Sequence, residues 1–100
     1  MQRYKFVCIK LKKNSYNALL FDLDEVVEGR TLTSLKREVG RVLINSMNEK
    51  QFLPNRGEID IRSLYKERTN SDISAEELQN ATIEEVKLEL HDNNVTLFIG

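Results

Sequence analysis

The segment from Thr31 to Asn48 is the only stretch of this chain long and periodic enough to predict a helix by itself. Its apolar side chains recur at spacings of three and four residues, so they form one stripe along a helix. The stripe consists of Leu32, Leu35, Val39, Val42, Leu43 and Met47. We expect Thr31 or Thr33 to cap the helix and Gly40 to mark close packing. Such a stripe needs a flat apolar surface to cover it.

Two segments before this helix alternate with period two and predict a β-hairpin. Tyr4 to Leu11 forms one strand and Asn17 to Asp24 the other, with a polar loop between them. If facing residue numbers sum to an even number, one sheet face collects Val7, Ile9, Leu11, Leu19, Phe21 and Leu23. We expect that face to cover the helix. The opposite face would then present a small apolar patch ringed by charge, with Phe6, Cys8, Lys10, Leu20 and Asp22 as partner-binding residues.

The second half of the chain predicts shorter elements. Strands are expected at Glu58 to Leu64, Ile83 to Leu90 and Val95 to Gly100. Ser74 followed by Glu77 has the spacing of a capping box and predicts a short helix or turn through Asn80. The polar residues 65–71 are expected to form an irregular excursion. The order is strand, strand, helix, strand, short helix, strand, strand.

Composition limits the class of protein. One hundred residues with 40% hydrophobic content predict one domain over residues 1–100. A net charge of −1 gives no overall attraction to nucleic acid or an anionic membrane, although the first half is basic and the second half acidic. The single cysteine permits no internal disulfide. No stretch is apolar enough for a signal peptide or for insertion into a membrane, so we expect a cytoplasmic protein.

A hairpin, one long helix across it and further strands is the order of the ubiquitin-like β-grasp fold. Residues 7–23 with the helix resemble the opening of the YukD/EsaB group, small cytosolic accessory proteins of type VII (WXG100) secretion systems. Residues 52–71 look like that group's loop and third strand, and residues 78–90 are similar to its closing turn and strand. The resemblance implies an α+β fold: a mixed sheet packed on one main helix. It also implies a non-enzymatic interaction module that docks on a larger protein.

Two features depart from that group. Residues 91–100 add a strand after the closing one, and Glu84-Glu85 replaces the expected glycine-aspartate turn. The extra hairpin partner could displace the third strand, project from the sheet, or itself be the closing strand. It could also cover the predicted patch, as could a second copy of the chain in a homodimer.

Other chemistries have weaker support. Asp22 and Asp24 after an apolar strand resemble the first motif of haloacid dehalogenase-like phosphatases, but the chain is too short for their parallel sheet. His91 lies in a predicted turn and Cys8 lies within a strand, so we expect no catalytic residue, no metal site and no cofactor. The terminal Gly100 leaves a ubiquitin-like tag or sulfur carrier as an alternative. Basic residues near Tyr4 and Phe6 leave nucleic-acid binding as another, namely Arg3, Lys5, Lys10, Lys12 and Lys13.

Overall fold

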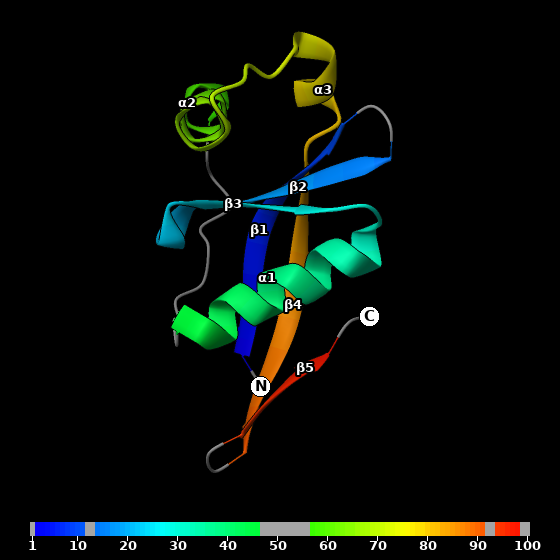
Figure 1. Cartoon of the computed structure of the whole chain (residues 1–100), viewed down its shortest axis with the longest axis vertical. Helices are drawn as coiled ribbons and strands as arrows, with labels where there is room; N and C mark the ends of the chain where they lie inside the picture. The colour runs from blue at the N-terminus through cyan, green and yellow to red at the C-terminus, as the bar shows by residue number, and fades with distance from the viewer. Residues whose placement is uncertain (1, 12–13, 47–56, 92–93, 99–100) are drawn as a thin grey trace.

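A computed structural model describes residues 2–11, 14–46, 57–91 and 94–98 of the chain. Its strands are β1 (Gln2–Leu11), β2 (Ser15–Leu20), β3 (Glu25–Gly29), β4 (Thr82–His91) and β5 (Asn94–Phe98). Its helices are α1 (Leu32–Ser46), α2 (Glu58–Thr69) and α3 (Ala75–Gln79), with a 3₁₀ turn at Phe21–Leu23. The protein is therefore an α+β domain in which helices pack on one sheet (Figure 1).

The five described strands form one sheet in the order β3-β2-β1-β4-β5. Every described pairing is antiparallel, including that of the central strands β1 and β4. The expectation of a mixed sheet is therefore wrong. The last strand pairs with β4 at the sheet edge, so β4 has β1 on one side and β5 on the other.

The first hairpin has the predicted register. Val7 faces Leu19 and Leu11 faces Ser15, so facing numbers sum to an even number. The second strand is shorter than expected, because the chain leaves β2 after Leu20 and makes the 3₁₀ turn. Asp24 ends this turn in the left-handed region with φ of 53°, and the chain then doubles back as β3. The sequence pattern did not predict this strand.

The predicted main helix is confirmed as α1. Thr31 caps it, because its side-chain Oγ1 accepts a hydrogen bond from the backbone N–H of Ser34 at 3.0 Å. Met47 and Asn48 lie outside the described residues. Gly40 is a position of close packing, as expected: a Cβ there would lie 2.5 Å from Leu97 Cδ2 of β5.

The helix covers the sheet face opposite to the one predicted. In an antiparallel pair, facing residues share a face, so Tyr4, Phe6, Cys8, Ala18, Leu20, Val86, Leu88 and Leu97 share one side. α1 lies on this side, since Gly40 meets Leu97 and the backbone of Leu35 lies against Gly29. Phe6 and Leu20 are fully buried there at 0% exposure. The expectation that the helix covers Val7, Ile9 and Leu19 is therefore wrong.

A second helix, α2, stands where a third strand was expected. Ile61, Leu64 and Tyr65 are buried at helical spacing, whereas Ile59 is 81% exposed. Acidic residues begin α2 and basic residues end it, as the helix dipole favours, and Asn70 closes it in the left-handed conformation with φ of 59°. The expected polar excursion over residues 65–71 is mostly the second half of this helix.

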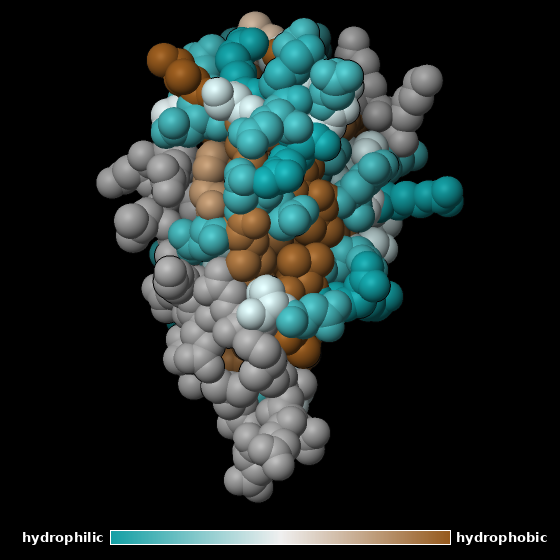
Figure 2. Space-filling model, turned by 60° about the vertical axis from the view of Figure 1, so that its left-hand side comes forward, coloured by the Kyte–Doolittle hydropathy of each residue, from teal (hydrophilic) through white to brown (hydrophobic). Residues whose placement is uncertain are grey.

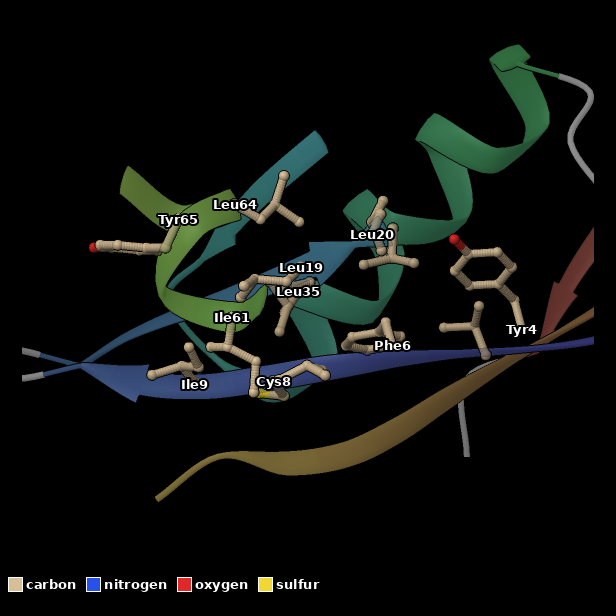
Figure 3. Close-up of a cluster of buried hydrophobic side chains, with 14 of the residues drawn as sticks. Tyr4, Phe6, Cys8, Ile9, Leu19, Leu20, Leu35, Ile61, Leu64 and Tyr65 are labelled. Atoms are coloured by element: carbon tan, nitrogen blue, oxygen red, sulfur yellow. The ribbon is translucent and has the colours of Figure 1, made fainter. Parts of the chain in front are cut away.

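α2 covers the face that α1 leaves free. Val7, Ile9 and Leu19 on that face are at most 2% exposed, and α2 contacts β2 and β3. Figure 1 shows β3 running between the two helices, and Figure 3 shows Ile61 of α2 beside Ile9 of β1. The central strand β1 is thus buried on both faces over residues 6–9, which explains why Phe6, Val7, Cys8 and Ile9 are all apolar.

The last part of the chain follows the prediction closely. Ser74 and Glu77 form the expected capping box at the start of α3, and each bonds the other's backbone N–H at 3.1 Å. His91 ends β4 rather than lying in a turn, and residues 92–93 and 99–100 lie outside the described residues. Among the described helices, none is both long and apolar enough to cross a membrane.

Candidate functional site

A cleft lies at one end of the sheet, on the α1 side. α1 begins only at Leu32, so on that face it leaves the end of β1, the start of β2 and the start of β4 uncovered. α3, which leads into β4, forms another wall. The cleft has a volume of about 460 Å³, within the range of pockets that bind small molecules or peptide side chains. Its lining residues are Cys8, Lys10, Leu11, Tyr16, Leu32, Glu76, Glu77, Asn80, Thr82 and Glu84.

Strand register supplies the sheet side of the cleft. Lys10 of β1 faces Tyr16 of β2, and Cys8 faces Thr82 of β4, so all four side chains project from the α1 face. The Lys10 ammonium lies over the Tyr16 ring, 5.9 Å from its centre, at the range of a cation–π contact. The sheet therefore contributes the Tyr16 ring and the Cys8 thiol to the cleft, together with the polar side chains of Lys10 and Thr82.

Carboxylates dominate the rim of the cleft. Glu84 accepts a hydrogen bond from Thr82 Oγ1 at 3.1 Å and pairs with Lys36 Nζ of α1 at 3.5 Å. Glu77 uses Oε1 in the capping box of α3. Glu76 is exposed, with no hydrogen bond or ion pair to any other residue that the structure describes. The lining thus carries three carboxylates against the single ammonium of Lys10.

Cys8 is not prepared for nucleophilic chemistry. Burial, and then the negative charge of Glu84, raise the pKa of the Cys8 thiol to about 11. Reactive cysteines have a pKa below the ordinary value, because the thiolate is the nucleophile. At neutral pH Cys8 is therefore a protonated, apolar part of the cleft.

The structure separates the five residues predicted to bind a partner. Cys8 and Lys10 line the cleft, Cys8 almost fully buried and Lys10 exposed. Phe6 and Leu20 lie in the core beneath α1 and offer no surface. Asp22 is half-buried in the 3₁₀ turn, away from the cleft. The apolar residues of the expected patch are buried, because α1 covers Phe6 and Leu20.

Asp22 belongs instead to a small buried polar pair. Its Oδ2 atom is buried without a hydrogen-bond partner in the described part of the chain, and the Tyr4 hydroxyl is buried close to the Asp22 backbone. Burial, and then the nearby charge of Asp22, raise the pKa of Tyr4 above its ordinary value. This arrangement stabilises the neutral phenol.

Residues on which the alternative functions depend are buried or paired in the structure. Tyr4 and Phe6 are buried at 3% and 0% exposure, so they cannot stack on nucleic-acid bases. Asp24 pairs with Arg68 of α2, which ties the 3₁₀ turn to that helix. Within the described residues, no three His, Cys, Asp or Glu side chains gather in a way that could hold a metal ion.

The carboxylate rim was missed by sequence reasoning, although one signal pointed toward it. The capping box of Ser74 and Glu77 predicted the start of α3, and Glu76 precedes Glu77 in the first turn of that helix. Only the tertiary structure brings them to Lys10 and Tyr16, which lie some sixty residues earlier in the chain.

Exposed apolar surface also lies outside the cleft. Ile59 of α2 and Ile83 of β4 are the most exposed large apolar side chains described, at 81% and 46%, and they lie on separate elements. Figure 2 shows a band of apolar atoms bordered by hydrophilic side chains on one side of the molecule.

Comparison with protein-family models, curated proteins and solved structures found no match.

Proposed function

We propose that this chain is a non-enzymatic, cytoplasmic protein-interaction module that binds a segment of a larger protein in the cleft between α1, α3 and the sheet. The observation that carries the proposal is the lining of the cleft, which combines apolar and aromatic contact area with a rim of carboxylates. Protein interfaces join an apolar centre to a polar rim in the same way. The raised pKa of the Cys8 thiol favours binding over covalent catalysis.

The narrower part of the proposal is a ubiquitin-like accessory role in a type VII secretion system, and it rests on the resemblance of residues 4–90. An opening hairpin and a helix across a five-stranded sheet support a β-grasp relationship. The antiparallel pairing of β1 with β4 and the helix α2 are departures from what the resemblance implied. The alternative of a tag or carrier depends on Gly100, which lies outside the described residues.

Site-specific photo-cross-linking in the native cell tests the interaction module. A photoreactive phenylalanine analogue replaces Asn80, which lines the cleft, and in a matched control replaces the exposed Ser63 of α2. We expect position 80 to yield a defined cross-linked protein that position 63 does not. Equal products at both positions, cross-links to nucleic acid alone, or no cross-link at position 80 would contradict the proposal. A secretion-machine component as the cross-linked protein would support the narrower role.

A further inference from the structure

We propose that the cleft binds an arginine side chain of the partner protein, an inference that rests on the proposed interaction function. The stem of the arginine would lie along the apolar part of the lining, formed by Cys8, Leu11 and Leu32. Its guanidinium would lie at the rim among Glu76, Glu77 and Glu84. The cleft thereby offers each part of one long cationic side chain a matching surface.

Charge complementarity selects a cation. Three carboxylates and one ammonium line the cleft, so its formal charge is negative although the whole chain carries only −1. The Lys10 ammonium lies over the Tyr16 ring, and Lys36 pairs with Glu84 from α1. Glu76 forms no ion pair with a basic residue in the described part of the chain. Only one carboxylate oxygen of Glu77 accepts the hydrogen bond of the capping box. A partner's cation would supply the charge that these two side chains lack.

The arrangement of the acceptors favours arginine over lysine. Glu76 and Glu77 are consecutive residues of α3, whereas Glu84 comes from β4, so acceptors approach from two elements. A planar guanidinium presents five N–H donors and can bond two carboxylates at once, whereas an ammonium acts as a point charge. The aliphatic and aromatic lining also suits the more weakly hydrated guanidinium.

The full chain can be tested with a minimal probe, the capped tripeptide Gly-Arg-Gly, against the same peptide with neutral citrulline in place of arginine. Amide resonances of the ¹⁵N-labelled protein are followed during titration. We expect the arginine peptide to shift the resonances of Cys8, Tyr16 and Thr82 with a Kd of about 1–10 mM, as for a small ligand. The citrulline peptide should bind at least about fivefold more weakly, because it lacks the charge.

Charge-neutral variants locate the site. Glu76→Gln should weaken binding of the arginine peptide about three- to fivefold, because it removes an exposed carboxylate without a described structural partner. Glu67→Gln, an exposed position on α2 outside the cleft, is the matched control and should leave the Kd unchanged. Equal binding of the citrulline peptide, shifts confined to other regions, an unaffected Glu76→Gln variant or no shifts at all would overturn the inference.

This outcome is separable from failure of the proposed function. A cross-link from position 80 that persists in the Glu76→Gln variant, together with no preference for arginine over citrulline, would retain the interaction module and reject the arginine. Loss of the cross-link in Glu76→Gln but not in Glu67→Gln would support both the interaction function and the arginine inference.

Discussion

α1 and α2 pack on opposite faces of the same sheet, but they cover it to different extents. α1 contacts β2, β3, β4 and β5, whereas the main sheet contacts of α2 are with β2 and β3. On the α1 face, Val86 of β4 is 1% exposed, while on the other face Ile83 of the same strand is 46% exposed. Both faces of the sheet are therefore covered by helices only over β1, β2 and β3. Beyond them it has one buried face, and the cleft opens where α1 begins.

The largest effects should come from deleting core side chains beneath each helix. Phe6→Ala, at 0% exposure beneath α1, should lower the free energy of unfolding by about 3–5 kcal/mol. Leu64→Ala, at 5% exposure in α2, should cost about 2–3 kcal/mol, because the cover on that side is less extensive. Ile59→Ala, on the outer surface of α2, is the control and should change stability little. Urea denaturation measures all three, and a neutral Leu64→Ala would break the two-sided account.

Glycine variants can probe the two places where α1 packs closely against the sheet. A Cβ at Gly29 would lie 2.6 Å from the backbone nitrogen of Leu35, which cannot move without shifting α1. Gly29→Ala should therefore cost about 1–3 kcal/mol, as overpacking does. At Gly40 the obstacle is the end of the Leu97 side chain, and alanine gains about 1 kcal/mol of helix propensity, so Gly40→Ala should be nearly neutral. Thermal unfolding of both variants checks the contrast, and a neutral Gly29→Ala would mean looser packing of α1 on β3.

Alkaline pH should lower the free energy of unfolding, because the Cys8 thiol beneath α1 loses its proton. The pKa of its thiol is about 11 in the folded chain against 9.0 ordinarily, so the folded state holds the proton more tightly. The resulting stability is complete below pH 9 and falls as the pH rises toward 11, at a slope of about 1 kcal/mol per pH unit. Urea titrations across this window should show a shallower decline for Cys8→Ala than for the native chain. Parallel declines would contradict burial of the thiol.

The smallest effects separate the ion pairs of the two helices. Lys36 of α1 and Glu84 of β4 form a pair whose side chains are only 12% and 24% exposed. Lys36→Met should cost about 1 kcal/mol, because it leaves Glu84 partly buried without its partner. Arg68 of α2 and Asp24 form a more exposed pair, and Arg68→Gln should produce no measurable change. Chemical denaturation at low and high salt distinguishes them, and equal losses would contradict the difference in burial.

Local sequence signals predicted the elements whose pattern is unambiguous. The stripe of α1, the capping box at Ser74 and the even register of the first hairpin are confirmed, because each depends on residues close in sequence. The segment 58–64 misled because Ile59 and Ile61 alternate with polar residues as in a strand. Its helical signals were Ile61, Leu64 and Tyr65 at three- and four-residue spacing, with acidic residues first and basic residues last.

The choice of sheet face could not be made from the hairpin alone. Both faces of β1 carry apolar residues, so the register groups Phe6 with Cys8 and Val7 with Ile9 without saying which pair lies under α1. Because α2 was not predicted, only one helix was available to cover the sheet. The other sheet face was therefore assigned to solvent. The candidate site followed the same pattern: Cys8 and Lys10 were identified, whereas Glu76 and Glu77 reach them only through tertiary packing.

The most direct test of the account is a set of methyl and aromatic NOEs on the labelled chain in solution. If the two helices cover opposite faces, Leu64 of α2 should show NOEs to Leu19 of β2 and none to Phe6. Leu35 of α1 should show NOEs to residues of the Phe6 and Leu20 face. NOEs from Leu35 to Val7 or Ile9, with Phe6 accessible to a soluble paramagnetic probe, would restore the opposite arrangement and contradict the account.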